Sequence, residues 1–182
     1  MRPGSSNAGV GRFFLLLALL ATAPAPATTI LYAATSQGGS SWRYEYSVIN
    51  DSLEAPILEF TIYFPLDRYA DLVVAGGPPG WDPLVAQPDA DLPDDGFYDA
   101  LALAGGIAPG ATLAGFGVTF SYLGAGAPGS QRFEVINPGS LAMLDAGNTA
   151  LVPLPGSGPG LAAAVLVAAA VRVRRRLRVV CQ

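Results

Sequence analysis

The sequence contains no histidine, no lysine and a single cysteine, Cys181, among 182 residues. Without histidine, neither a Ser-His-Asp triad nor a Cys-His pair can be assembled. Zinc sites draw mainly on cysteine and histidine, so this class of metal site is disfavoured as well. One cysteine cannot form an intramolecular disulfide, which leaves the hydrophobic core to stabilise the fold alone. These absences predict a protein that is not an enzyme.

Positive charge is scarce in the middle of the chain. All fourteen acidic residues lie between Glu45 and Asp145, whereas seven of the ten arginines lie near the two ends. Residues 28–151 therefore combine three arginines with fourteen acids, a formal charge of −11. Because phosphate binding requires a basic surface, we expect no interaction with nucleic acid.

Long hydrophobic runs are also missing, and the two short ones lie near the termini. The chain is predicted to begin with a secretory signal peptide, residues 1–27. Its apolar run, 13–21, is shorter than the about 20 residues that span a bilayer, which favours cleavage over an uncleaved anchor helix. Signal peptidase is expected to cut after the small residues Ala25 and Ala27, with Ala23 ending a second possible site.

The middle of the chain shows the period-two alternation of half-buried strands. About seven or eight short strands are separated by glycine and proline turns, and no helical period intervenes. This spacing predicts an all-β fold, an antiparallel Ig-like or jelly-roll-type β-sandwich over residues 28–136. Residues 137–151 are expected to form a linker, with one helical turn possible at 141–144. The clearest predicted strands are 29–35, 41–49, 58–64, 71–75, 97–103, 113–123 and 133–136.

Two tryptophans are the first candidates for stacking on a sugar ring. Trp42 alternates in register with Tyr44 and Tyr46, a pattern that is more typical of a core position. Trp81 follows a Gly-Pro-Pro-Gly turn, which leaves its exposure open. Asn50 begins an Asn-Asp-Ser acceptor pattern for N-glycosylation, which by itself predicts little.

A loop rich in aspartate is the only candidate metal site. Crowded carboxylates on a loop are the hard oxygen ligands that Ca²⁺ prefers. The spacing departs from the EF-hand pattern, however, because Pro93 displaces the third acid and no glutamate follows at the twelfth position. A solvated acidic turn is the plainer interpretation, and no other cofactor is expected. The candidate calcium ligands are Asp89, Asp91, Asp94, Asp95 and Asp99.

The C-terminal segment, 152–182, combines a proline motif, an apolar stretch and an arginine cluster. Its strictly apolar part, 161–171, would be about 16 Å long as a helix, so a single hydrophobic helix here would cross a membrane only marginally. The arginines after it are expected to stay on the cytoplasmic side. The proline motif is Val152, Pro153, Leu154 and Pro155, and the basic cluster is Arg172, Arg174, Arg175, Arg176 and Arg178.

This arrangement resembles the PEP-CTERM class of bacterial sorting signals in its V-P-L-P-A variant. Val152, Pro153 and Pro155 match the recognition motif, and residues 174–176 match the basic stop. The resemblance implies export in a Gram-negative bacterium and transient anchoring in the inner membrane. It further implies processing by an exosortase-type enzyme and delivery to the cell envelope or outside, in a system associated with extracellular polysaccharide and biofilm.

Three functions remain open for the β-sandwich. The first is a structural or adhesive role in the cell envelope or extracellular matrix. The second is a module that binds polysaccharide or Ca²⁺, and the remote third is a carboxylate-based glycoside hydrolase. A featureless polar surface would favour the first, and an exposed aromatic row or convergent carboxylates on one rim would favour the second. The hydrolase requires two carboxylates that face each other across a cleft.

Overall fold

The computed structural model describes residues 28–153. The predicted signal peptide, 1–27, and the segment 154–182 lie outside the described residues. Leu154, Pro155, the predicted hydrophobic helix, the arginine cluster and Cys181 therefore receive no structural account. The regular elements of residues 28–153 are all strands, and within this range no helix is long and apolar enough to cross a membrane.

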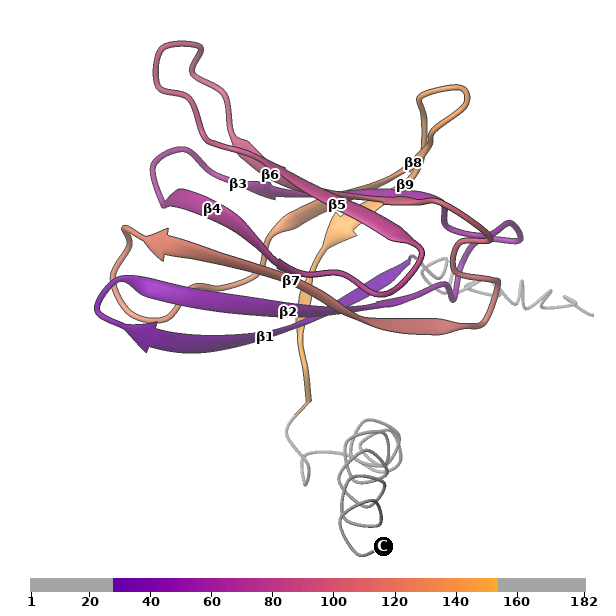
Figure 1. The fold of residues 1–182 in the computed structure, drawn as a ribbon, viewed down its shortest axis with the longest axis horizontal. Coiled ribbons are helices and arrows are strands. Elements are labelled where there is room, and N and C mark those ends of the chain that lie inside the picture. Colours follow the sequence, from indigo (N-terminus) through magenta and orange to yellow (C-terminus); the bar gives the residue numbers. More distant parts are fainter. Residues whose placement is uncertain (1–27, 154–182) are drawn as a thin grey trace, which may run out of the picture.

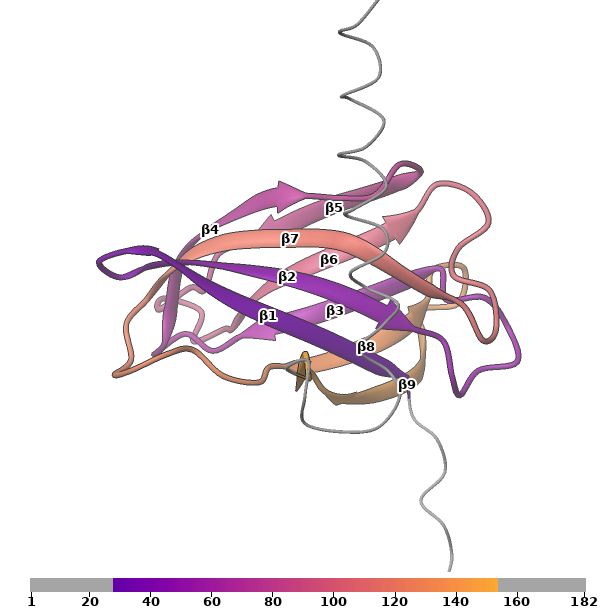
Figure 2. The ribbon, with the colours of Figure 1, turned by 90° about the horizontal axis from the view of Figure 1, so that it is seen from below.

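The described chain folds into two five-stranded sheets packed face to face (Figure 1). Sheet A has the order β10-β1-β2-β7-β4, and sheet B has the order β5-β6-β3-β8-β9. Figure 2 shows the long strands of sheet A side by side. The strands are β1 (Thr29–Gly38), β2 (Ser41–Ile49), β3 (Glu59–Phe64), β4 (Tyr69–Gly76), β5 (Trp81–Ala86), β6 (Gly96–Ala102), β7 (Thr112–Tyr122), β8 (Arg132–Asn137), β9 (Ala142–Asn148) and β10 (Ala150–Leu151).

The predicted β-hairpin between the first two strands is confirmed. β1 and β2 pair antiparallel from Thr29↔Ile49 to Ser36↔Trp42. Gly38 and Gly39 connect them at φ angles of 106° and 58°, a backbone region that glycine adopts without steric cost. The turn sets the register of β2, and hence which of its side chains enter the core.

Aromatic rings fill the space between the sheets. Phe60 of sheet B lies edge-on to Phe116 of sheet A, with ring centroids 4.9 Å apart. Trp81 meets the same Phe116 ring at 5.1 Å, also nearly perpendicular. Edge-to-face pairs contribute stability beyond the area that they bury. The all-β sandwich predicted from alternation is confirmed, and its core is built from rings that alternate along the strands.

The prediction that residues 137–151 form a linker is wrong. This segment forms β9, which pairs antiparallel with β8, and β10, which pairs parallel with β1. The possible helical turn at 141–144 is not formed, because Ala142, Met143 and Leu144 lie in β9. Both strands lie at sheet edges and most of their side chains are exposed, so they lack the alternation that marks a half-buried strand. The sandwich therefore extends to Leu151 and has ten strands, rather than seven or eight, with one parallel pair.

β5 was not among the predicted strands, because it contains Pro83. Proline cannot donate to a ladder, but β5 is an edge strand, where this loss is tolerated. Its first residue, Trp81, is buried at 9% exposure, and Trp42 is half-buried against the core. Neither tryptophan forms an exposed stacking platform. The core position expected for Trp42 is confirmed.

Asn50 is a structural residue of the turn after β2. Its side chain is fully buried and donates from Nδ2 to the backbone oxygens of Ala55, at 3.0 Å, and Ile107, at 2.9 Å. Its Oδ1 accepts from the Leu53 N–H at 3.2 Å. All its side-chain groups are thus used internally, and in the folded domain this asparagine is inaccessible to a glycosylating enzyme.

Candidate functional site

The outer face of sheet B carries the candidate site. Along β3, Phe60, Ile62 and Phe64 are fully buried, so the alternate residues point away from sheet A. The antiparallel ladders of sheet B align these outward residues into rows across the strands. The three rows are Ala86, Phe97, Tyr63, Arg132 and Asn148; then Leu84, Asp99, Thr61, Glu134 and Ala146; then Asp82, Leu101, Glu59, Ile136 and Met143.

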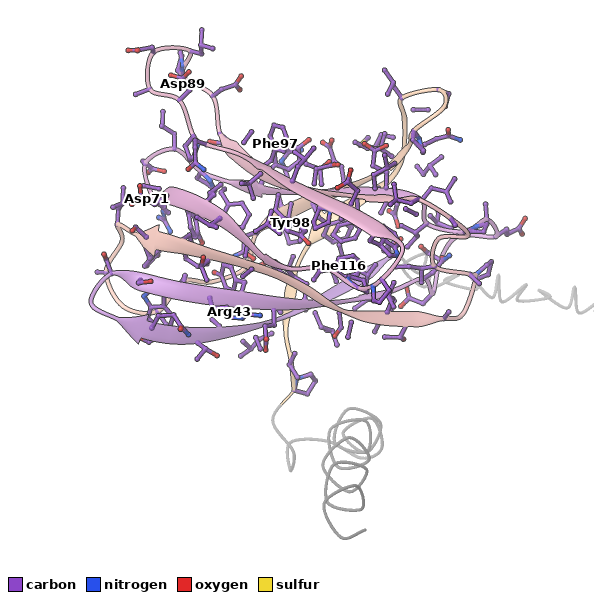
Figure 3. All side chains as sticks on the ribbon, in the orientation of Figure 1. Arg43, Asp71, Asp89, Phe97, Tyr98 and Phe116 are labelled. Carbon is purple, nitrogen blue, oxygen red and sulfur yellow. The ribbon has the colours of Figure 1, made fainter. Side chains whose placement is uncertain are left out.

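The first row contains two neighbouring aromatic side chains, Phe97 and Tyr63, both half-buried. Figure 3 shows Phe97 above the upper sheet, whereas Tyr98 and Phe116 lie between the sheets. The guanidinium of Arg132 lies over the Tyr63 ring, 3.7 Å from its centroid. This contact is a cation–π interaction, and it covers one side of the tyrosine ring.

Glu134 connects the first two rows. Its carboxylate accepts from the Tyr63 hydroxyl at 2.8 Å and forms an ion pair with Arg132. Burial raises the pKa of Tyr63, and the hydrogen bond to Glu134 adds to this rise. The hydroxyl is therefore a fixed, neutral donor, and the orientation of the tyrosine ring is set by two partners on β8.

Two further carboxylates lie beside this group. Asp99 accepts from the Thr61 hydroxyl at 2.7 Å, and burial raises its pKa despite that bond. Burial also raises the pKa of Glu59, and the negative charge of Asp99 raises it further. Partly desolvated carboxylates are strong hydrogen-bond acceptors for hydroxyl groups. The face therefore offers apolar rings at one end and acceptors at its centre.

A hollow of about 350 Å³ lies where this face meets the 86–96 loop. An adjoining hollow of about 440 Å³ shares Tyr63, Asp95 and Arg132, and reaches Arg68. In Figure 1 this loop and the β8–β9 loop both rise from the upper sheet, on the side away from sheet A. The first hollow is lined by Tyr63, Pro93, Asp94, Asp95, Phe97 and Arg132.

The five candidate calcium ligands do not converge. The Asp89 carboxylate accepts from the backbone N–H of Asp91 at 2.8 Å, and Asp95 accepts from the Leu66 N–H at 3.1 Å. Asp99 lies on β6 and contacts Thr61. Within residues 28–153, no three His, Cys, Asp or Glu side chains are placed to hold a metal ion. The aspartates shape the loop, and calcium binding stays a prediction from the sequence.

The opposite face of the sandwich has a different character. On the outer side of sheet A, Arg43 aligns with Thr119, and Glu45 aligns with Gly117. Arg43 forms an ion pair with Glu45 at 3.2 Å and lies over Gly117. These rows carry small and charged side chains and no aromatic ring. The aromatic pair is therefore a property of sheet B.

The predicted sorting motif begins where the sandwich ends. The backbone N–H of Val152 donates to the Tyr32 oxygen at 2.9 Å, which continues the pairing of β10 with β1. Val152 and Pro153 are its two described residues. The predicted cleavage residues, Ala25 and Ala27, precede the first described residue, Thr28.

Alternation alone placed Tyr63 on the polar side of its strand, opposite Phe60 and Ile62. The signal that could have selected it is an aromatic ring at an outward position of a strand. Its neighbours Phe97 and Arg132 come from β6 and β8, and no local pattern indicates that these strands flank β3. The candidate site was therefore missed by the sequence analysis.

No family model matches the sequence, and no curated protein matches it. Among solved structures, an uncharacterised protein from Nocardia farcinica with an immunoglobulin-like fold aligns at 20% identity, over 73% of this chain and 89% of that one, with a TM-score of 0.47. A cohesin module of a family 33 glycoside hydrolase from Clostridium perfringens aligns at 8% identity, over 69% and 96%, with a TM-score of 0.41. A family 3b carbohydrate-binding module from Clostridium clariflavum aligns at 12% identity, over 70% and 98%, with a TM-score of 0.40. Structural similarities at this level of identity and TM-score do not assign a function to this chain.

Proposed function

We propose that the protein is a non-catalytic polysaccharide-binding module, and that the outer face of sheet B is its ligand face. The observation that carries the proposal is the outward pair Phe97 and Tyr63 beside the hollow under the 86–96 loop. Aromatic rings offer an apolar surface to the C–H face of a sugar ring, and the neighbouring carboxylates accept from its hydroxyls. This outward, half-buried aromatic pair supports a binding module over a purely structural role.

The carboxylates of this face do not suit hydrolysis. Asp99 and Glu134 lie on one row with Thr61 between them, so both extend from the same sheet in the same direction. A glycosidase needs an acid and a base or nucleophile on opposite sides of the scissile bond. Thr61 and Tyr63 also occupy the two carboxylates as hydrogen-bond donors. The arrangement suits the binding of hydroxyl groups.

The charges favour a neutral ligand. Arg132, the cation nearest the aromatic pair, is paired with Glu134, and Asp94 and Asp95 line the same hollow. The surrounding domain carries a formal charge of −11 over residues 28–151. An acidic polysaccharide would meet net repulsion on this face. The ligand class is therefore an uncharged polysaccharide.

Replacing either ring of the pair tests the ligand face. We expect Phe97→Ala and Tyr63→Ala each to weaken binding to a soluble neutral glucan by roughly tenfold, since about 1.4 kcal/mol of stacking corresponds to that factor. Affinity electrophoresis of the exported protein in gels with and without the glucan measures the loss. Alginate serves as the acidic comparison and is expected to retard none of the proteins.

Val73→Ala is the matched control, because Val73 is 58% exposed on sheet A, away from the ligand face. It should leave the retardation unchanged. Equal retardation of wild type, Phe97→Ala and Tyr63→Ala would overturn the assignment of the face. Retardation by alginate alone would overturn the neutral ligand class.

For the route of the protein, we propose export followed by exosortase-type sorting through residues 152–182. The fold supports an orientation for the anchored state. Val152 is held at the sheet A edge through its bond to Tyr32, so the sorting segment departs from sheet A. The ligand face is the outer side of the other sheet. A domain tethered in this way presents the ligand face away from its attachment point.

Intact-mass measurement tests the sorting proposal. We expect the protein that the native host releases into the medium to end near Pro155. The double variant Pro153→Ala and Pro155→Ala is expected to keep its C-terminal tail and to stay in the membrane fraction. Pro159→Ala, which changes a proline outside the motif, is the control and should be processed normally. Wild-type protein found in the membrane with its mass extending to Gln182 would contradict the proposal.

A further inference from the structure

The first described residue, Thr28, is buried beside the carboxylate of Asp145. It is 3% exposed, and its backbone nitrogen lies 2.6 Å from Oδ2 of Asp145 on β9. The same carboxylate oxygen accepts from the Ser52 hydroxyl at 3.1 Å, and the Thr28 hydroxyl lies 3.1 Å from that of Ser52. Three segments that are distant in the sequence thus meet around one backbone nitrogen.

The surroundings of the Thr28 nitrogen carry more negative charge than a peptide N–H requires. A second carboxylate, Asp51, accepts from the hydroxyl of the next residue, Thr29, at 2.9 Å. Burial raises the pKa of Asp145, but hydrogen bonds from Thr28, Ala146 and Ser52 outweigh that effect and leave the pKa below its ordinary value. Asp145 is therefore a charged acceptor. A backbone N–H offers it one donor and no positive charge.

We infer that signal-peptide removal between Ala27 and Thr28 creates an α-ammonium group that forms a partly buried ion pair with Asp145. This inference goes beyond polysaccharide binding and rests on the predicted signal peptide. Signal peptidase adds one water across the peptide bond. The water oxygen bonds to the Ala27 carbonyl carbon as the C–N bond breaks, which leaves a carboxylate, and the Thr28 nitrogen keeps its proton and gains the two protons of the water to become –NH₃⁺.

Processing at this bond strengthens the contact that the unprocessed chain already makes. The nitrogen that donates one N–H to Asp145 becomes a cation with three N–H groups beside the same carboxylate. Charge-assisted hydrogen bonds are shorter and stronger than neutral ones. Cleavage at the alternative site after Ala23 would leave residues 24–27 attached, and the nitrogen of Thr28 would stay a neutral amide. Of the two predicted cleavage sites, only the one after Ala27 therefore places an ammonium group at Asp145.

The absence of lysine makes the inference testable by chemistry. The α-amine is the sole primary amine of the chain, so an acetylating reagent modifies that position selectively among amines. The full-length gene is expressed in its native host, and the exported protein is sequenced from its N-terminus and labelled under native conditions. We expect a first residue of Thr28, and acetylation at least tenfold faster in Asp145→Asn than in wild type.

A stability cycle separates the ion pair from a general loosening of the fold. Asp145→Asn, and acetylation of the unfolded wild type followed by refolding, should each lower the urea midpoint. The two changes together should lower it no further than either alone, because both remove one interaction. Asp51→Asn is the control, because it removes an equal charge nearby. It should leave the acetylation rate within twofold of wild type.

An N-terminus at Pro24, or at another residue, would overturn the inference whatever the outcome of the glucan experiment. Equal acetylation rates in wild type and Asp145→Asn would overturn it as well. So would additive losses of stability in the cycle, since independent contributions exclude a shared contact. Binding to the glucan is expected to be unaffected by Asp145→Asn, because Asp145 is absent from the rows of the ligand face.

Discussion

Replacing Phe60 by alanine is expected to destabilise the protein by about 4 kcal/mol, close to the loss measured when buried phenyl rings are removed elsewhere. Phe60 is fully buried at the centre of sheet B. Its ring meets Phe116 at 4.9 Å, Trp81 at 5.9 Å and Tyr98 at 6.4 Å between centroids. These neighbours come from both sheets and cannot collapse together into the vacated space. Urea denaturation followed by tryptophan fluorescence measures the change.

Phe97→Ala is the matched control for this substitution. It removes the same side chain from the adjacent strand, but on the outer face, where the ring is half-buried. We expect a loss of about 1 kcal/mol or less, as for most surface positions. Phe97→Ala should thus weaken glucan binding by roughly tenfold while it leaves the fold stable. Equal destabilisation by the two variants would contradict the assignment of inner and outer faces.

Asn50→Ala is expected to cost about 3 kcal/mol, through hydrogen bonds rather than packing. The change removes one hydrogen bond each from the Ala55 oxygen, the Ile107 oxygen and the Leu53 N–H, all within 3.2 Å of the amide. Asn50 is fully buried, and each lost bond costs about 1 kcal/mol. The midpoint of thermal unfolding, followed by far-ultraviolet circular dichroism, reports the effect.

Asn137→Ala provides the comparison for Asn50→Ala. The Asn137 side chain also accepts two backbone N–H bonds, from Gly139 at 2.9 Å and Ser140 at 3.2 Å. That turn is exposed, however, so water can take over both bonds. We expect a loss of under about 1 kcal/mol. A similar loss at both positions would show that burial does not determine the cost, contrary to the argument for Asn50.

The proposed ligand face and the core lie on opposite sides of the same strands. Residues of the ligand face can therefore serve binding without a role in the core. Inward residues of β3 and β6 form the aromatic core, and the alternate residues are free to specialise. Tyr63 and Phe97 can therefore be changed without a cavity in the core. Weaker glucan binding by variants at these two positions can therefore be attributed to the ligand face rather than to misfolding.

The sequence by itself determined the secondary-structure class and the facing of several strands. In β3, strict alternation assigns Phe60, Ile62 and Phe64 to the core and leaves Thr61 and Tyr63 outside, because side chains of a strand have a period of two. The sequence also shows that the chain has no histidine for a Ser-His-Asp triad, and that residues 28–151 carry a formal charge of −11.

Only the tertiary structure decided which strands are neighbours. Tyr63 and Glu134 are 71 residues apart in the sequence, and their hydrogen bond exists because β8 lies beside β3. The edge strands β9 and β10 were missed for the same reason, since exposed residues become strands through pairing rather than through local pattern. Long-range pairing likewise places Asp145 at the nitrogen of Thr28, 117 residues earlier in the sequence. The alternation of side chains is a property of each strand alone, so the sequence predicts it. The proposed ligand face and the contact between Thr28 and Asp145 arise from pairing between distant segments.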